Sequence, residues 1–350
     1  MFMALSTHNA LAAALLTLSA STVSAQTTVR DVLQTVKPST PKVSGLLNVR
    51  YAYDSQDESN GFDIRRMRLG VSGDFGKSID YKVQAEYGGG SATSAASVKL
   101  LDAYLRVKIA KPINIQVGEY KVAYSQETLD GPATWLTIEN PTAVNKLNAY
   151  SDESGMRANS RDIGLTLYGV LAQSKGRDVV TYRLGVFNGN GINLKDNDSH
   201  KDLSAYLTVS PTKSLTLSAA HYAGHYTTVG SQNTATTLRR DRTSAGFTYT
   251  EGAFRLRSEY LHGKTGARSH QGVYAIASYN LPHGLQPVVS YGYYQKDVDT
   301  KRDNQSDYLI GLNWQPLKNV RLQLDYTLTD FTNSEKDNRS LLETQLLVSF

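Results

Sequence analysis

Apolar and polar residues alternate along segment 63–87, which is divided by a short Gly-Lys-Ser turn. Before the turn, Met67, Leu69 and Val71 fall on one side and Arg66 and Arg68 on the other. After the turn, apolar residues again share one side, opposite Asp, Lys, Gln and Glu. A repeat of two residues is typical of β-strands. The segment therefore predicts two paired strands with one charged face.

Strand-like segments of the same kind continue to the end of the chain. We expect sixteen, at 43–54, 63–75, 78–88, 98–109, 112–120, 161–171, 178–187, 203–211, 214–225, 239–250, 253–263, 272–281, 284–295, 306–315, 319–330 and 340–350. Most have about 9–12 residues, the length that crosses a bilayer at a tilt. A water-soluble sandwich would bury the apolar faces, whereas a membrane barrel turns them to lipid and lines its lumen with the charges.

The connections between these segments alternate between short and long. Short turns are expected at 75–78, 110–112, 172–177, 211–213, 250–252, 280–284 and 315–318. Longer polar links are expected at 55–62, 89–97, 121–160, 188–202, 226–238, 264–271, 296–305 and 331–339. Seven short turns and eight long loops are the layout of a sixteen-stranded up-and-down barrel with both ends in the periplasm. A propeller would instead show a repeat for each blade, and the sequence has none.

The apolar faces fit contact with lipid. One such face carries Leu101, Ala103, Leu105, Val107 and Ile109. Tyrosines and tryptophan near strand ends, where such rings suit the membrane interface, are Tyr51, Tyr53, Tyr279, Tyr291, Tyr293, Trp314 and Tyr326. The last alternating strand ends in Phe350, which resembles the C-terminal signal of bacterial outer-membrane proteins. We predict an all-β transmembrane antiparallel barrel of about sixteen strands over residues 43–350.

The N-terminus has a different pattern. An apolar run at 10–18 leads to Val23-Ser24-Ala25, a pattern typical of signal-peptide cleavage. We therefore expect a signal peptide at 1–25, export to the outer membrane, and a short periplasmic lead-in at 26–42. The alternative is a buried N-terminal helix.

Composition narrows the chemistry. The chain lacks cysteine, which excludes disulfides, thiolate metal sites and cysteine nucleophiles. The formal net charge is +5, and the basic residues are spread singly along strands rather than gathered in a basic arm. This distribution favours a small anionic solute over nucleic acid as the partner. We expect no catalytic residue, metal or cofactor.

The face opposite the apolar set is the predicted lumen lining. Its basic members are Arg50, Arg66, Arg68, Lys82, Arg106, Lys108, Arg183, Arg255, Arg257 and Arg321. Its acidic members are Asp80, Glu86, Asp102, Asp162, Glu259, Asp325 and Glu343. Arginine keeps its charge and pairs with phosphate or carboxylate through two nitrogens, and rings of basic residues make pores anion-selective. The alternative is that the mixed charges only keep the lumen hydrated.

The longest link, 121–160, contains apolar residues such as Trp135, Leu136 and Ile138. A loop of this length inside a compact protein is usually functional. As the third long loop of a wide barrel, it is expected to fold inward and narrow the channel. The alternative is a surface loop with a small helix.

Three blocks of sequence resemble the phosphate-selective porin O/P family of Gram-negative bacteria. They are Phe62-Asp-Ile-Arg-Arg-Met-Arg-Leu-Gly-Val-Ser-Gly73; Leu100-Leu-Asp-Ala-Tyr-Leu105 with Val117-Gly-Glu-Tyr-Lys-Val-Ala-Tyr-Ser125; and Arg161-Asp-Ile-Gly-Leu-Thr-Leu-Tyr-Gly169 with Leu184-Gly-Val-Phe-Asn-Gly-Asn-Gly-Ile-Asn193. The resemblance implies a sixteen-stranded homotrimeric porin in outer-membrane lipid, with an inward third loop. It also implies a path of arginine and lysine residues and a phosphate site at the constriction.

By position, the resemblance assigns anion contact to Arg65, Arg66 and Lys121, and adds Asp102 and Ser125 as further site members. Strict alternation, however, places Arg65 on the lipid side. Three explanations remain open. A β-bulge turns the side chain inward, the residue lies beyond the edge of the bilayer, or the assignment taken from the family does not hold for Arg65.

The sequence thus predicts a passive, anion-preferring porin, with phosphate as the expected solute. The anion-binding and pore-lining residues we expect are Arg50, Arg65, Arg66, Arg68, Lys82, Asp102, Arg106, Lys108, Lys121 and Ser125. A general porin and a structural or adhesive surface protein are the alternatives. An outer-membrane hydrolase would need Ser, His and an acidic or amide partner together, and the histidines form no such pattern with a serine.

Overall fold

The computed structural model describes residues 38–90, 95–148, 152–153, 159–229, 235–300, 303–332 and 336–350. The predicted signal peptide, residues 1–25, lies outside the described residues. Most of the predicted lead-in also does, because only residues 38–42 of it are described and Lys42 already begins the first strand.

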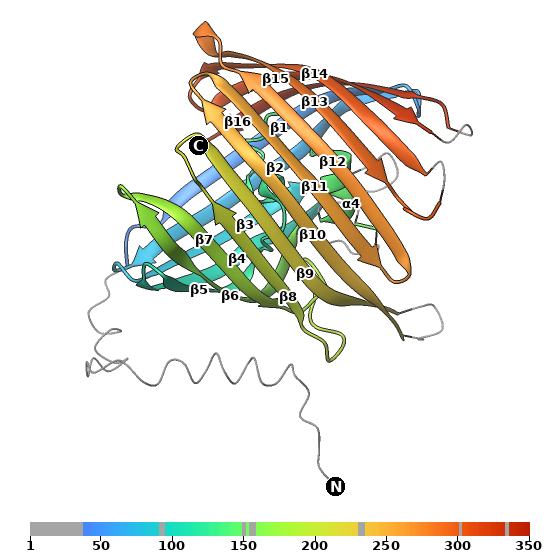
Figure 1. The fold of residues 1–350 in the computed structure, drawn as a ribbon. Coiled ribbons are helices and arrows are strands. Elements are labelled where there is room, and N and C mark those ends of the chain that lie inside the picture. The colour runs from blue at the N-terminus through green and yellow to red at the C-terminus, as the bar shows by residue number, and fades with distance from the viewer. Residues whose placement is uncertain are drawn as a thin grey trace, which may run out of the picture. The chain divides into compact units, whose positions relative to one another are not determined.

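Sixteen antiparallel strands close into one barrel, with β1 paired to both β2 and β16 (Figure 1). Their bounds are β1 Lys42–Asp54, β2 Ser59–Phe75, β3 Ile79–Gly88, β4 Ser97–Ala110, β5 Ile113–Lys121, β6 Arg161–Ser174, β7 Arg177–Phe187, β8 Asp202–Val209, β9 Leu215–Val229, β10 Ala235–Glu251, β11 Phe254–Thr265, β12 Arg268–Tyr279, β13 Leu285–Gln295, β14 Asn304–Leu317, β15 Val320–Phe331 and β16 Arg339–Ser349. The predicted fold class and number of strands are confirmed.

Several strands run longer than the alternating apolar pattern. β10 begins at Ala235 rather than 239, and β12 begins at Arg268 rather than 272. The predicted long link at 264–271 is therefore wrong, since β11 and β12 are joined by a tight turn in which Gly266 has a φ of 59°. A paired ladder needs only backbone hydrogen bonds, so it can continue where polar side chains face water on both sides.

Alternation correctly assigns most side chains to the two faces. On β2, Met67 and Leu69 are exposed on the outer surface, whereas Arg66 and Arg68 are buried on the inner one. The pairing of Asn48 with Arg66 is followed directly by that of Val49 with Ile64, so Arg65 is an extra residue in β2. This β-bulge turns Arg65 inward, which is the first of the three explanations considered above.

A second bulge corrects one assignment. Leu101 was expected to face lipid, but its side chain is 0% exposed. Gln84 pairs with Asp102 and Ala85 with Leu100, so Leu101 is the unpaired residue. Upstream of the bulge, Leu100 takes the outward position and is exposed instead.

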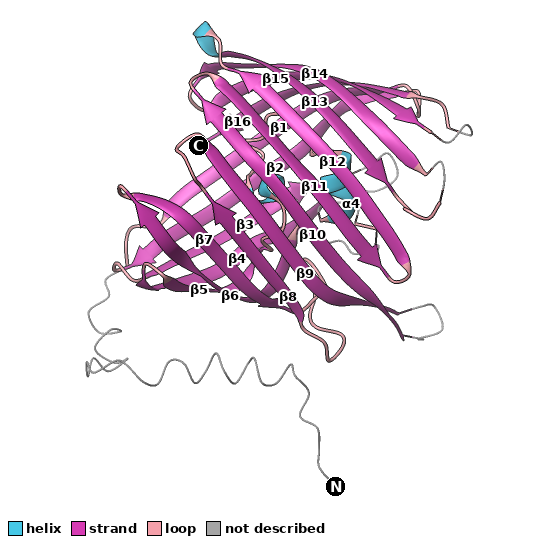
Figure 2. Cartoon of the chain, viewed as in Figure 1, coloured by secondary structure: helices cyan, strands magenta, loops and turns pink. Residues whose placement is uncertain are grey.

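The connection between β5 and β6, residues 122–160, is called loop L3 below. It contains two short helices, α3 Gln126–Leu129 and α4 Thr142–Leu147 (Figure 2). Ser125 caps α3 by accepting a hydrogen bond from the backbone N–H of Glu127. Ala143, Val144 and Leu147 of α4 are buried in one cluster with Leu261 and Tyr274, which belong to β11 and β12.

Hydrogen bonds join loop L3 to side chains on the inner face of several strands. Ser125 donates to Glu259 of β11 over 2.6 Å, and the amide of Ile138 donates to Asp325 of β15 over 2.7 Å. Asn313 of β14 donates to the carbonyl of Leu136 over 2.9 Å.

A short 3-10 helix, η1 Pro282–Gly284, lies in the β12–β13 turn. Within the described residues, no helix is long and apolar enough to cross a membrane.

Candidate functional site

Loop L3 helps to line two cavities. The first, called the short-turn cavity, has a volume of about 520 Å³ and reaches Gly45 and Phe350, at the strand ends that carry the short turns. Six basic residues line it, and Asp102 is the one acidic residue among its lining. The basic residues are Arg68, Lys82, Arg106, Lys121, Arg161 and Arg183.

Four of these six basic residues have a carboxylate partner. Arg68 pairs with Glu86 over 2.6 Å, and Arg106 pairs with Asp80 over 2.6 Å. Lys82 and Arg161 share the carboxylate of Asp102, over 2.8 and 2.9 Å. These charges are therefore compensated at least in part within the protein.

Lys121 and Arg183 have no carboxylate at ion-pair distance in the described part of the chain. The Nζ of Lys121 donates to backbone carbonyls of loop L3, those of Leu129 and Asp130. The guanidinium of Arg183 lies over the ring of Tyr168, 5.6 Å from its centroid. The net positive charge of the short-turn cavity therefore comes from these two side chains and from the pair of Lys82 and Arg161, which share one carboxylate.

The second cavity, called the long-loop cavity, has a volume of about 450 Å³. It lies toward the strand ends that carry the long loops, because Asp54, Ser59 and Arg339 line it. Its basic residues are Arg50, Arg65 and Arg339, and its acidic residues are Asp54, Glu139, Asp307 and Glu343. Acidic residues thus outnumber basic ones by one here, in contrast to the short-turn cavity.

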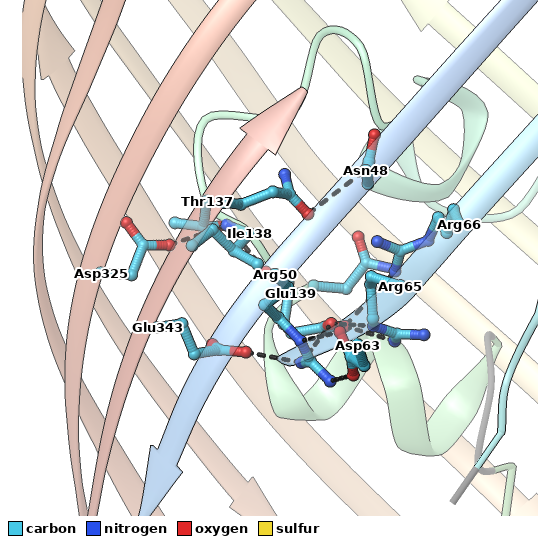
Figure 3. Close-up of polar contacts among 12 residues, drawn as sticks. Asn48, Arg50, Asp63, Arg65, Arg66, Thr137, Ile138, Glu139, Asp325 and Glu343 are labelled. Carbon is cyan, nitrogen blue, oxygen red and sulfur yellow. Dashed lines mark hydrogen bonds and ion pairs between the residues drawn. The ribbon is translucent and has the colours of Figure 1, made fainter. Parts of the chain in front are cut away.

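Glu139 of loop L3 is at the centre of an arginine cluster in the long-loop cavity (Figure 3). Arg65 donates to both of its carboxylate oxygens, from Nε to Oε1 and from Nη2 to Oε2, the latter over 2.8 Å. Arg50 lies 3.2 Å from Oε1 and Arg66 3.4 Å from Oε2. Burial raises the pKa of Glu139, but the positive charges of Arg65 and Arg66 outweigh it and hold the pKa well below its usual range.

Acidic side chains of the barrel wall complete this cluster. Arg50 also pairs with Asp63 over 2.5 Å and with Glu343 over 2.7 Å. Figure 3 shows Glu343 approaching Arg50 from the side opposite Asp63. The three arginines Arg50, Arg65 and Arg66 therefore contact three carboxylates, and their charges cancel within the cluster.

The structure separates the predicted site residues into groups. Arg68, Lys82, Asp102, Arg106 and Lys121 come together in the short-turn cavity, and Arg50 and Arg65 line the long-loop cavity.

The other three predicted residues line neither cavity. Arg66 faces inward but is only 1% exposed, with its guanidinium 5.1 Å from the ring centroid of Trp135. Ser125 is buried and bonded to Glu259, and Lys108 pairs with Asp80 over 2.9 Å.

Several contributing residues were missed from the sequence. Arg161 begins β6 and lies two residues before Ile163, so alternation would have placed it on the lipid face and not on the inner one. Arg240 and Arg242 share the inner face of β10, where both pair with Asp152 of loop L3 over 2.9 and 2.8 Å. Glu139 and Asp152 belong to a loop without periodicity, so no sequence signal pointed to them. The described residues contain no group of three or more side chains suited to hold a metal ion.

A family model described as phosphate-selective porin O and P matches residues 46–350. No curated protein matches the sequence.

Similar solved structures include the trimer form of OmpT, an outer membrane protein of Vibrio cholerae, with 12% identity and a TM-score of 0.65 over 89% of this chain and 99% of that one. An anion-selective porin from Comamonas acidovorans has 15% identity and a TM-score of 0.62 over 90% and 100%. The outer membrane channel DcaP of Acinetobacter baumannii has 13% identity and a TM-score of 0.63 over 89% and 97%. Because the sequence identities are this low, the similarity to these three structures establishes only that the fold is shared.

Proposed function

This chain belongs to the phosphate-selective porin O and P family, and we propose that its barrel is a diffusion channel that prefers anions such as phosphate. The family and the closed sixteen-stranded barrel make it a porin of the bacterial outer membrane, which is a channel protein and not an enzyme. The preference for anions, and for phosphate among them, is the proposed part.

The observation that carries the proposal is the charge of the short-turn cavity. Six basic side chains and one acidic side chain line it, and two of the basic ones have no carboxylate partner among the residues that the structure describes. A positive potential in a confined lumen raises the local concentration of anions. Several weak basic sites close together let an anion bind and leave again, as conduction requires. Guanidinium and ammonium groups both bind phosphate oxygens well.

Loop L3 is the proposed constriction. Its residues 122–128 and 135–138 are buried, and both cavities include residues of the loop in their lining. Hydrogen bonds to β11, β14 and β15 hold it against the inner wall. A solute that crosses the barrel would therefore pass beside this loop, between the two cavities.

The surroundings of the channel are also proposals. OmpT of Vibrio cholerae is described in a trimer form, and we propose a homotrimer for this chain. The exposed apolar side chains of the outer face, among them Leu69, Leu105, Ile310 and Leu324, would contact outer-membrane lipid. Residues 1–25 would direct export as a signal peptide.

The sign of the reversal potential tests the proposed function. We expect purified protein in a planar bilayer under a KCl gradient to give a reversal potential of the sign set by chloride, because the short-turn cavity is positive. A potential set by potassium would contradict the proposal. A value near zero would indicate a general porin, and a folded protein without conductance would indicate a structural role.

Replacing Lys121 by Ala should weaken the block of chloride current by added phosphate. We expect the half-blocking phosphate concentration to rise about tenfold, since a hydrogen bond to a charged group contributes roughly 1.5 kcal/mol or more. Lys146 is the matched control, because it lies in loop L3, which directly follows Lys121, carries the same charge and lines neither cavity. An equal change in Lys121→Ala and Lys146→Ala would argue against a phosphate contact at Lys121.

A further inference from the structure

We propose that the carboxylate of Glu139 is a tethered anion that fills the arginine site of Arg50, Arg65 and Arg66, so that Glu139 sets how strongly this channel binds its permeating anion. The inference rests on the proposed function, because it concerns the anion that the channel carries. Loop L3 would then supply a residue that controls specificity, in addition to lining two cavities.

The first argument is the geometry of the contact. The two oxygens of Glu139 meet Nε and Nη2 of Arg65, one oxygen on each nitrogen. Arginine binds phosphate in the same way, through two parallel N–H···O bonds from its planar fork. Arg50 and Arg66 approach the same carboxylate within 3.4 Å. The guanidinium nitrogens that reach this position are therefore already in contact with a carboxylate of the chain.

The second argument is that loop L3 holds Glu139 in place. The residue before it, Ile138, is 1% exposed, and its amide donates to Asp325 over 2.7 Å. Thr137 bridges the turn by donating to the carbonyl of Glu139 over 2.8 Å. A tethered group binds as if present at an effective concentration of about millimolar or above. Free phosphate would have to exceed that concentration to displace the carboxylate.

The third argument is the charge balance around Glu139. Three arginines face three carboxylates, those of Glu139, Asp63 and Glu343. Since the pKa of Glu139 is held well below its usual range, the carboxylate stays charged at neutral pH. Removing this one negative charge would leave the cluster with a net positive charge, directed into the long-loop cavity that Arg50 and Arg65 line.

A simpler role for Glu139 is an ion pair that only attaches loop L3 to the wall. The two roles differ in their consequence for phosphate. A tethered anion competes with phosphate for Arg65, so its loss creates a binding site that saturates. If Glu139 only attaches the loop, it does not compete with phosphate. Its loss would then change the conductance or the stability and leave phosphate binding unchanged.

Glu139→Gln separates these roles, with Asp307→Asn as the matched control. Asp307 lines the same cavity, and its replacement removes the same charge. Among the described residues it accepts hydrogen bonds from Thr142, Gln305 and Thr329 and pairs with no arginine. In Glu139→Gln we expect phosphate to block the chloride current at a concentration about tenfold lower than in the wild type, since the tethered competitor is gone. Asp307→Asn should shift the reversal potential toward chloride and leave the half-blocking concentration unchanged.

Two outcomes would overturn the inference. One is an unchanged half-blocking concentration in Glu139→Gln. The other is an equal decrease in Asp307→Asn, which would assign the effect to long-range charge alone. A wild-type channel that prefers cations would instead refute the proposed function, so the two failures are distinguishable.

Two further variants extend the test. Adding Arg65→Gln to Glu139→Gln should remove the gained block, because Arg65 supplies the two-nitrogen grip. Glu139→Asp keeps the negative charge that attaches the loop, but its side chain is shorter. This variant replaces Glu139→Gln in the test if Glu139→Gln does not fold. It should lower the half-blocking concentration about threefold through a weaker tethered competitor. Block identical to that of the wild type in Glu139→Asp would also overturn the inference.

Discussion

Replacing Arg183 by Glu is expected to lower the occupancy of the short-turn cavity by a monovalent anion about fivefold, and so to reduce the preference for anions. Unit charges 8 Å apart in water interact by about 0.5 kcal/mol, and reversing a charge changes this energy by twice that amount. Arg183 should show the full effect because no carboxylate pairs with it among the described residues, whereas Arg68, Lys82, Arg106 and Arg161 all have one. The ratio of chloride to potassium permeability, taken from reversal potentials at low salt, measures the change.

Lys213→Glu is the matched control for Arg183→Glu. Lys213 lies in the exposed turn between β8 and β9, at the same end of the barrel but outside the short-turn cavity. It undergoes the same charge reversal, and at this position solvent ions should screen most of its effect. If Lys213→Glu changes the permeability ratio as much as Arg183→Glu, net charge and not the cavity determines selectivity. Raising the salt concentration should also reduce the difference between Arg183→Glu and the wild type.

The largest loss of stability is expected from Asp152→Ala. The side chains of Asp152, Arg240 and Arg242 are 0, 3 and 1% exposed, and Asp152 pairs with both arginines. Removing the shared carboxylate takes away the acidic partner of two buried guanidinium groups. Breaking a buried ion pair in this way lowers the free energy of unfolding by about 3–5 kcal/mol. The measurement is the free energy of unfolding in detergent micelles from denaturant titration. Because Arg242 also donates to the carbonyl of Leu147, part of the attachment of α4 should remain.

Asp196→Ala is the control for this effect. Asp196 pairs with Lys201, whose side chain is 48% exposed. Exposed ion pairs contribute roughly 0–1 kcal/mol, so this variant should unfold close to the wild type. A similar free energy of unfolding for Asp152→Ala and Asp196→Ala would contradict the argument that the buried cluster attaches loop L3 to β10.

The barrel could be predicted from the sequence because its signal is local and repeated. Each strand carries its own alternation, and each turn its own Gly, Pro or Asn, so sixteen segments could be identified without any knowledge of their pairing. The same alternation assigned Arg68, Lys82 and Arg106 to the inner face, where they line the short-turn cavity. Residues 62–73 and the other two blocks also carried enough of the family pattern for the family to be named.

Alternation failed where a strand contains an extra residue. Arg65 and Leu101 were both assigned to the lipid face, and both turn inward at bulges. A bulge depends on how two neighbouring strands are paired, and that pairing cannot be read from either strand alone. Arg65 was the one position where the family resemblance and the alternation disagreed, and that disagreement coincided with the bulge.

The sequence by itself determined the barrel, its two faces and most of the charged residues on the inner face, because these follow from a two-residue repeat within each strand. The tertiary structure alone decided which of those charges remain uncompensated. Arg183 and Lys82 look equivalent in sequence, yet Lys82 pairs with a carboxylate from β4, and no carboxylate of the described part of the chain pairs with Arg183. Glu139 lies 73 residues from Arg66 along the chain, and only the folding of loop L3 brings it to the arginine cluster. The physical reason is that compensation depends on distances of a few ångströms between elements remote in sequence.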